Sequence, residues 1–265
     1  MIYFGLIYAS VALFFSLWIF HDQASLVMVF LTVMACVPLI YNTIKMEEKK
    51  DTTINKESLL LKEHGKALAF FMFLFIGFTL AYAFWYVLLP PDIVTDAFET
   101  QTQTILQINS PVTGDALLKL QIFSRVLFNN IKVLIFCILF AFLYGVGAIF
   151  ILTWNASVIG VAIGSFIRSE MSLVAKELHL YTVGNYFHIF SIGLLRYALH
   201  GIPEVLAYFV GGLAGGIISI AVIRHDMGTR KFEKIVLDSS ELIVLSIMLL
   251  VVAALVEVYL TPVLF

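Results

Sequence analysis

Apolar runs long enough to cross a lipid bilayer recur along the whole of this chain. A transmembrane helix needs about 20 consecutive apolar residues, and each run here is continuous, whereas the strands of a membrane β-barrel alternate apolar with polar residues. The pattern therefore predicts an all-α, polytopic helical membrane protein with about seven spans. The runs that we assign to membrane crossings are Ile2–Phe20, Ala24–Ile44, Ala67–Leu89, Ile131–Thr153, Val183–Leu199, Pro203–Ile223 and Leu242–Leu260.

Composition supports the same class. The chain has 265 residues, of which 61% are hydrophobic and 13% charged, whereas an average soluble domain is about 25% charged. One core of this size cannot hide that much apolar surface, so lipid must be the main solvent. The net charge of −2 and the lack of a long basic run exclude nucleic acid as an expected partner. Cys36 and Cys137 lie inside apolar runs, which disfavours a structural disulfide or a reactive thiolate.

The positions of the basic residues predict the orientation in the membrane. Short loops rich in Lys and Arg stay in the cytoplasm, which places segment 45–66 and the second basic segment, 224–234, inside. The amino terminus is then expected inside and the carboxyl terminus outside the cell membrane. This organisation gives a helical hairpin over 1–44, a cytoplasmic charged loop over 45–66 and a five-span core over 67–265.

Two segments do not fit simple crossings. Residues 92–128 are expected to form an outer polar excursion, and its second half, 114–128, has the apolar spacing of an amphipathic helix lying at the interface. Residues 156–167 form a run of only about twelve apolar residues, too short for a bilayer core of about 30 Å. We therefore predict a re-entrant or half-spanning segment there.

The stretch from Arg196 to Gly216 contains the polar residues of greatest interest. Arg196, His200 and Glu204 are spaced by four, which would align them on one face of an unbroken helix. Pro203 favours a helix that begins there, which would leave His200 in the preceding turn. Because charged groups in a membrane are costly, these residues form either a structural clamp or a site for a proton, ion or solute. A zinc site is a further alternative, but His200 and Glu204 supply only two ligands, and His188 or His179 would have to complete it.

Other candidate residues have a favoured structural interpretation. Asn130 and Asn155 flank the predicted fourth span, where helix capping is favoured over ligand binding, although both also join the candidate polar intramembrane site. Glu257 is expected to extend toward the outer interface, and a partner such as Arg196 or His200 would make it functional. Four further glycines have two interpretations. The favoured one is that they are small residues that permit close helix packing, and the alternative is that they leave backbone carbonyl groups free beside a pore. They are Gly160, Gly164, Gly211 and Gly215.

Several of these residues together resemble the stage II sporulation protein M family. The resemblance is carried by Asn129–Val133, by Gly145 and Gly147, by Asn155 with Gly160, and above all by His200–Glu204 with Ala207 and Gly215. It covers about residues 60–262, so the first two spans look like an addition to a five-span family core. This chain has Ala156 where the family often has Gly.

The resemblance implies an integral membrane protein without enzymatic chemistry, and in spore formers a scaffold that holds cell-wall hydrolases during engulfment. We therefore expect this chain to organise a membrane complex around a polar intramembrane centre. The expected partners are membrane lipid, other membrane or extracytoplasmic proteins that dock on 114–128 and 45–66, and a second copy packed through the glycine faces. The alternatives are an ion or small-solute channel or transporter that uses the broken region 155–204, and a zinc-dependent membrane enzyme.

Overall fold

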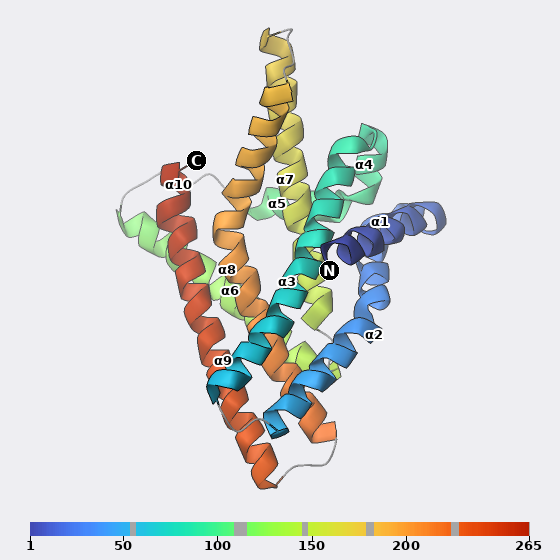
Figure 1. Cartoon of the computed structure of the whole chain (residues 1–265). Coiled ribbons are helices and arrows are strands. Elements are labelled where there is room, and N and C mark those ends of the chain that lie inside the picture. Colours follow the sequence, from blue (N-terminus) through green and yellow to red (C-terminus); the bar gives the residue numbers. More distant parts are fainter. Residues whose placement is uncertain (54–56, 109–115, 145–147, 179–182, 224–227, 265) are drawn as a thin grey trace.

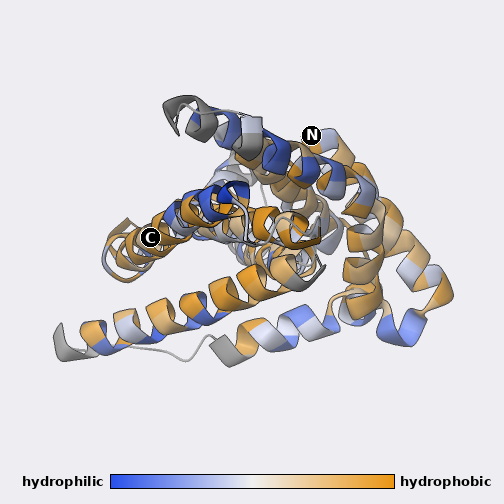
Figure 2. Ribbon diagram, turned by 90° about the horizontal axis from the view of Figure 1, so that it is seen from below, coloured by the Kyte–Doolittle hydropathy of each residue, from blue (hydrophilic) through white to orange (hydrophobic). Residues whose placement is uncertain are grey.

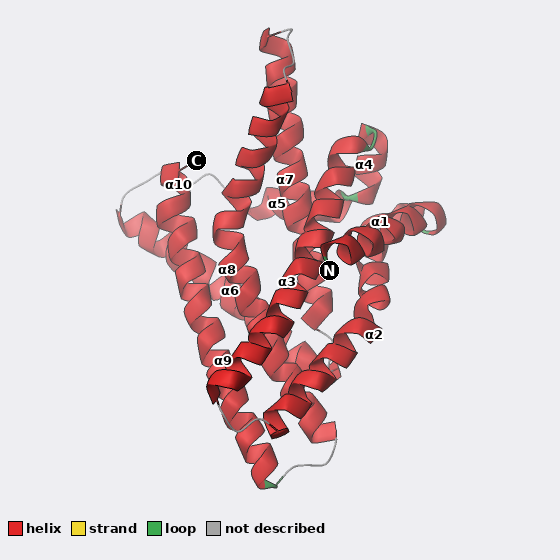
Figure 3. Ribbon diagram, in the orientation of Figure 1, coloured by secondary structure: helices red, strands yellow, loops and turns green. Residues whose placement is uncertain are grey.

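The computed structural model describes residues 1–53, 57–108, 116–144, 148–178, 183–223 and 228–264, and these ranges are helical apart from short connections (Figures 1 and 3). Two short elements differ from α-helices: η1 is a 3₁₀ turn and η2 is a π-helical turn. The elements are α1 (Ile2–Ile19), η1 (His21–Gln23), α2 (Ala24–Thr53), α3 (Glu57–Leu88), α4 (Pro91–Ala97), α5 (Glu99–Ile108), α6 (Ala116–Tyr144), α7 (Ala148–Leu178), α8 (Val183–Ile223), α9 (Arg230–Leu255), η2 (Val256–Leu260) and α10 (Thr261–Leu264).

Seven helical segments are long and apolar enough to cross a membrane, which confirms the predicted all-α class and the number of spans. Large apolar side chains remain exposed along several of them, such as Trp18 on α1 with 79% of its surface exposed. Figure 2 shows hydrophobic residues predominating along the peripheral helices. This is the surface expected of a protein in contact with lipid. The candidate spans are Ile2–Ile19, His21–Lys50, Lys62–Leu88, Lys119–Phe142, Ala148–Ser172, Ser191–Ile223 and Arg230–Leu264.

The boundary between the fourth and fifth spans differs from the prediction. α6 ends at Tyr144 and α7 begins at Ala148, so the predicted span 131–153 is divided between two helices. Residues 156–167 lie inside the 31-residue helix α7 and are not a separate re-entrant or half-spanning segment. The prediction took Asn155 as a helix end, but a single polar side chain does not break a helix in lipid, where every backbone group must be hydrogen-bonded internally.

The outer excursion also has a different structure. Residues 116–128 continue directly into the fourth span as the first turns of α6, so the predicted separate interfacial helix is wrong. α4 and α5 instead pack against the bundle, with Phe98 and Gln101 fully buried. The amide Nε2 of Gln101 donates to the carbonyl of Ser25 at 2.9 Å and to Ser157 Oγ at 3.3 Å. Gln101 therefore attaches α5 to both α2 and α7.

The predicted charged loop is largely helical, because α2 extends to Thr53 and α3 begins at Glu57. Ion pairs join the two helices at this end. His64 Nδ1 lies 2.9 Å from Glu47 Oε2, and Lys50 Nζ lies 2.7 Å from Glu47 Oε1 and 3.2 Å from Glu63 Oε2. Glu47 and His64 are buried, with 3% of each side chain exposed. This surface is thus partly occupied by contacts within the chain.

Helix ends gather at two opposite poles of the molecule. In Figure 1 the end of α2, the start of α3, the end of α8 and the start of α9 lie at the bottom, so the two basic segments flank the same pole. α4, the end of α7, the start of α8 and α10 lie toward the top.

Glycines allow the helices of the bundle to approach closely. A Cβ atom added to Gly5 would lie 2.4 Å from the carbonyl oxygen of Leu74, and one added to Gly77 would lie 2.4 Å from that of Ile2. α1 and α3 therefore cross with almost no space between their backbones. Such contacts are the usual packing mode of small residues in membrane helices.

Candidate functional site

α8 is one continuous 41-residue helix that contains Pro203 in its interior. The predicted turn at 201–202 and helix start at Pro203 are therefore wrong. A proline removes one backbone hydrogen bond, but membrane helices tolerate it because neighbouring groups satisfy the freed carbonyl. Arg196, His200 and Glu204 consequently occupy successive turns on one side of α8. The side chain of Arg196 lies outside the described part of the structure, and His200 is half-buried.

Glu204 lies in the middle of the candidate span Ser191–Ile223. Its carboxylate oxygen Oε1 accepts a hydrogen bond of 2.8 Å from the hydroxyl of Tyr208, one turn further along α8. Tyr208 is 1% exposed and belongs to the core of the bundle. The sequence pattern did not single out Tyr208, although its spacing of four from Glu204 would have indicated a shared helix face.

Glu257 is a further acidic residue, near the end of the last span. It lies in the π-helical turn η2, which packs against both α6 and α8. Its side chain is partly buried, and its extension toward the outer interface stays a prediction. π-helical turns often occur at functional sites, because the extra residue redirects side chains.

Asn130 reaches the site from α6. An added Cβ on Gly211 would meet Leu134 at 2.4 Å, and one on Gly215 would meet the carbonyl of Ile138 at 2.6 Å. α6 and α8 therefore run parallel, and one turn earlier Asn130 stands opposite Ala207, next to Glu204 and Tyr208. Asn130 is 5% exposed, and its Nδ2 has no hydrogen-bond partner among the described residues. It lies inside α6 and does not cap a helix.

Asn155 approaches the same level from α7. Added Cβ atoms on Gly212 and Gly193 would meet Ala148 at 3.0 Å and Phe166 at 2.8 Å, so α7 and α8 run antiparallel. Asn155 lies seven residues after Ala148 and eleven before Phe166 in the sequence, which puts it on the same α7 face and at the level of Glu204. Its Nδ2 is also buried without a partner in the described part of the chain. Like Asn130, it is interior to a helix and caps none.

The site thus combines a carboxyl group, two carboxamides, an imidazole and a phenol. They come from α6, α7 and α8, and the structure brings together the sequence-predicted His200, Glu204, Asn130 and Asn155 with the unpredicted Tyr208. Such polar groups inside a membrane mark either strong helix association or a proton or ion site.

His188, His200 and Glu204 do not form a metal site. His188 is on the same helix as His200 but about 18 Å away along its axis, at 1.5 Å per residue. One metal ion needs its ligands within about 2–3 Å. Among the described residues, no group of three or more His, Cys, Asp or Glu side chains could hold a metal ion. His179 lies outside the described residues.

The predicted packing glycines contact other helices of the same chain. Added Cβ atoms on Gly160 and Gly164 would lie 2.8 Å from Tyr82 and Tyr86 of α3, while Gly211 and Gly215 face α6. These faces are therefore occupied, and a homodimer would have to use a different surface.

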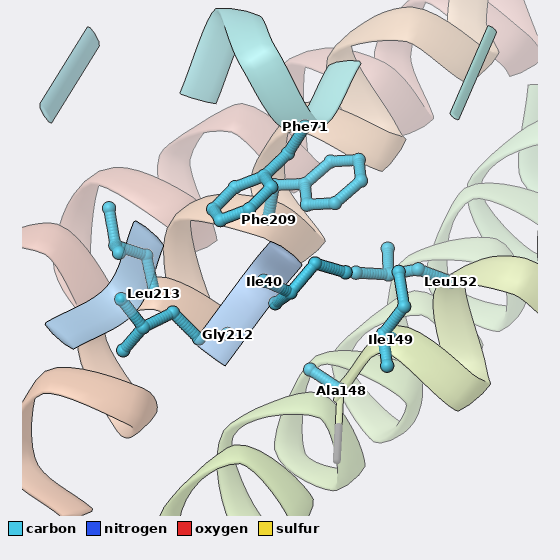
Figure 4. A pocket seen from close by; sticks show the side chains of 9 residues that line it. Ile40, Phe71, Ala148, Ile149, Leu152, Phe209, Gly212 and Leu213 are labelled. Atoms are coloured by element: carbon cyan, nitrogen blue, oxygen red, sulfur yellow. The ribbon is translucent and has the colours of Figure 1, made fainter. Parts of the chain in front are cut away.

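A small pocket lies elsewhere in the bundle, where α2, α3, α7 and α8 meet (Figure 4). The rings of Phe71 and Phe209 stack at one side of it, with centroids 5.6 Å apart. The lining offers no side chain suited to catalysis. It consists of Ile40, Ile44, Phe71, Ala148, Ile149, Leu152, Phe209, Gly212 and Leu213.

Comparison with known proteins identifies the class to which this architecture belongs. It is a multi-pass membrane protein whose residues 66–262 match the family described as stage II sporulation protein M. Since the match covers most of the chain, the protein belongs to this family, which confirms the resemblance seen in its sequence. The match begins at residue 66, so α1 and α2 lie before it.

One relative is an uncharacterized protein of Methanocaldococcus jannaschii. It is 29% identical over 143 residues, which cover 53% of this chain and 71% of that protein. No solved structure matches the chain significantly.

Proposed function

We propose that this protein is a non-enzymatic scaffold that holds a partner protein on the outer side of the membrane. The observation that carries the proposal is the length of α7 and α8, which have 31 and 41 residues. About 20 residues are enough to cross the hydrocarbon core. The two helices therefore extend well beyond the bilayer, and Figure 1 shows their connected ends projecting further than any other element.

The side chains at the base of this projection suit an aqueous environment. The sequence of α7 becomes polar from Arg168 onward, and Ser169 and Ser172 are exposed, as is His188 on α8. Arg168 lies near the carbonyls of Val87 and Leu89 at the end of α3. That contact ties the projection to the membrane-spanning bundle. The α8 arm is mostly apolar over residues 186–195. A helical hairpin with one polar and one apolar arm on a fixed base can present a docking surface to an extracytoplasmic protein or to the outer part of another membrane protein.

Site-specific cross-linking tests this proposal. A photoreactive amino acid at Ser172 or at His188 should give the same discrete cross-linked partner in native membranes. The matched control is Met248, a lipid-exposed position on α9, which should give no such product. A version with a shortened α7–α8 hairpin that still inserts and folds should lose the partner. Equal partner capture by the shortened protein, or none from either hairpin position, would refute the scaffold role assigned to this hairpin.

The surface at the start of α6 is a second candidate for docking. The side chains of Lys119, Gln121 and Arg125 are exposed there, within the predicted contact surface 114–128. Charge reversal at Lys119 and Arg125 tests whether it contributes to the same complex.

Ion or small-solute transport is the second candidate function. The sequence suggested transport because the region 155–204 was expected to contain broken helices. The described parts of α7 and α8 are continuous helices, so this argument no longer holds. The polar centre formed by Glu204, Tyr208, Asn130 and Asn155 is the observation that favours it instead. Ion flux into proteoliposomes, measured for wild type, Glu204→Gln and His200→Ala, separates the two functions. A scaffold gives no flux above empty vesicles, whereas flux that requires Glu204 indicates transport.

We also propose that the pole bearing the basic segments is cytoplasmic, which places the amino terminus inside and the carboxyl terminus and the α7–α8 hairpin outside. The support is the shared position of both basic segments at one pole, together with the tendency of basic loops to remain inside.

A further inference from the structure

A stripe of polar side chains on α6 points away from the bundle. Gln121, Arg125, Asn129 and Lys132 are exposed, and their spacing of four, four and three residues places them on one face of the helix. The buried residues of α6 lie on the opposite face, and they are Asn130, Leu134, Cys137 and Ala141. Only 22% of the candidate span in α6 is buried, the smallest share among the seven spans. The stripe therefore faces the surroundings of the protein.

Part of this stripe must lie at the depth of the hydrocarbon core. α6 has 29 residues, and every stretch of about 20 residues within it, the length of one crossing, contains Arg125, Asn129 and Lys132. Even when the crossing is placed as late in α6 as possible, Lys132 lies about 10 Å along the helix axis from its first residue. A lysine side chain can extend toward the interface, but the short carboxamide of Asn129 cannot. Lipid offers these groups no hydrogen-bond partner at that depth.

The stripe is cationic, and its own helix supplies no counter-charge. α6 contains neither Asp nor Glu, and no ion pair to Arg125 or Lys132 occurs among the described residues. A charge exposed to hydrocarbon is costly unless it is paired. A carboxylate would neutralise the ammonium group of Lys132 and accept a hydrogen bond from the amide of Asn129. The surface complementary to this stripe is therefore acidic.

We propose that α6 binds a transmembrane helix of a different protein, with an Asp or Glu side chain of that helix facing Lys132 and Asn129. Polar side chains that bond across helices help to associate helices in lipid. A second copy of this chain fits less well, because a symmetric α6–α6 contact would place each Lys132 beside its own counterpart and leave like charges together. The site lies at the depth of the membrane, and it does not depend on the α7–α8 hairpin.

A synthetic transmembrane helix tests the proposal. The probe is a leucine-rich helix with a single Asp at the depth of Lys132, and energy transfer to a dye on the full-length protein measures its binding in phosphatidylcholine vesicles. This probe should bind wild type, whereas the same helix with Leu in place of Asp should not. Lys132→Met should weaken binding about 5- to 30-fold, the range expected for a polar contact between membrane helices, and Asn129→Leu should weaken it less. Phe136→Leu, on the same exposed face, is the matched control and should leave binding unchanged.

A second measurement uses only the wild-type protein and so does not depend on how the variants fold. The Asp of the probe is moved by one helical turn at a time toward either end. Binding should be strongest when the depth of the Asp matches that of Lys132, and it should weaken in both directions from there.

Four results would overturn the proposal. One is equal binding of the Asp-bearing and the all-leucine probes. Another is binding that neither Lys132→Met nor Asn129→Leu weakens, which would place the probe on a different surface. The third is energy transfer between two copies of the protein that disappears in Lys132→Met, which would show that a second copy covers the stripe. The fourth is phosphatidylglycerol retained by wild type but not by Lys132→Met in native mass spectrometry, which would show that a lipid headgroup neutralises Lys132.

Discussion

Glycine residues in one helix of this protein have opposite expected sensitivities to substitution. Gly77→Ala places a methyl group 2.4 Å from a backbone carbonyl of α1, whereas a Cβ on Gly65, also in α3, meets nothing within 4 Å. We expect Gly77→Ala to destabilise the protein by about 1–3 kcal/mol, because backbone atoms cannot move aside easily. Gly65→Ala is the matched control and should be neutral or stabilising by up to about 1 kcal/mol. Thermal unfolding in detergent measures both, and equal midpoints would contradict the close α1–α3 crossing.

The sequence predicted individual residues of the site better than it predicted their surroundings. Arg196, His200 and Glu204 were identifiable because charged residues are rare in apolar runs. Glu257 was identifiable on the same ground, but no local pattern shows that it lies in a π-helical turn that packs against α6 and α8. Tyr208 was not predicted. Aromatic residues are so common in these spans that the one whose hydroxyl bonds to a carboxylate cannot be recognised from the sequence.

The side chain of Gln101 supplies two of the hydrogen bonds that attach the α4–α5 element to the bundle, and the Ser25–Thr100 hydroxyl pair supplies another at 2.7 Å. Gln101→Leu removes the hydrogen bonds to the Ser25 carbonyl and to Ser157, and leaves these buried groups with fewer partners. We expect faster amide hydrogen exchange across 91–108, with little change in α9. Gln103→Leu is the control, because Gln103 is exposed and bonds only Glu99 of its own helix. Unchanged exchange in the Gln101 variant would show that the Ser25–Thr100 hydrogen bond and the apolar contacts are enough to hold the element.

The ends of α2 and α3 should be held together mainly by the buried carboxylate of Glu47. Glu47→Ala leaves both His64 and Lys50 without this partner, at a cost of about 3 kcal/mol for a buried ion pair that loses one member. Lys66→Ala removes an exposed partner of Glu63 and should cost less than about 1 kcal/mol. Chemical denaturation monitored by a probe on α3 distinguishes the two variants. Similar losses would contradict a special role for Glu47.

Helix boundaries were the least predictable elements, for a physical reason. In water, an Asn or Pro often ends a helix, because solvent can bond the freed backbone groups. In lipid that alternative is absent, so helices continue through Asn155 and Pro203 despite the local preference. The class and the number of spans were predictable, since they follow from hydrophobic length alone.

At the scale of the whole molecule, the two poles should face different compartments. Single cysteines introduced at exposed positions Lys62 and Gly228 should react with an impermeant thiol reagent only after the cytoplasmic side is opened. Cysteines at Thr95 and His188, also exposed, should react in intact cells. Cys36 and Cys137 are buried and should contribute little background. Labelling of all four positions from one side would contradict the seven-span topology.

Because α8 is much longer than the membrane is thick, the ends of α7 and α8 that face each other lie at a fixed height above the membrane. At 1.5 Å per residue α8 is about 60 Å long, roughly twice the thickness of the hydrocarbon core. The tip of the hairpin therefore stands on the order of 20–30 Å clear of the lipid, and the rigidity of paired helices keeps that height constant. The protein can act as a spacer: adding two heptads to each arm would raise the bound partner by about 20 Å without altering a single membrane contact.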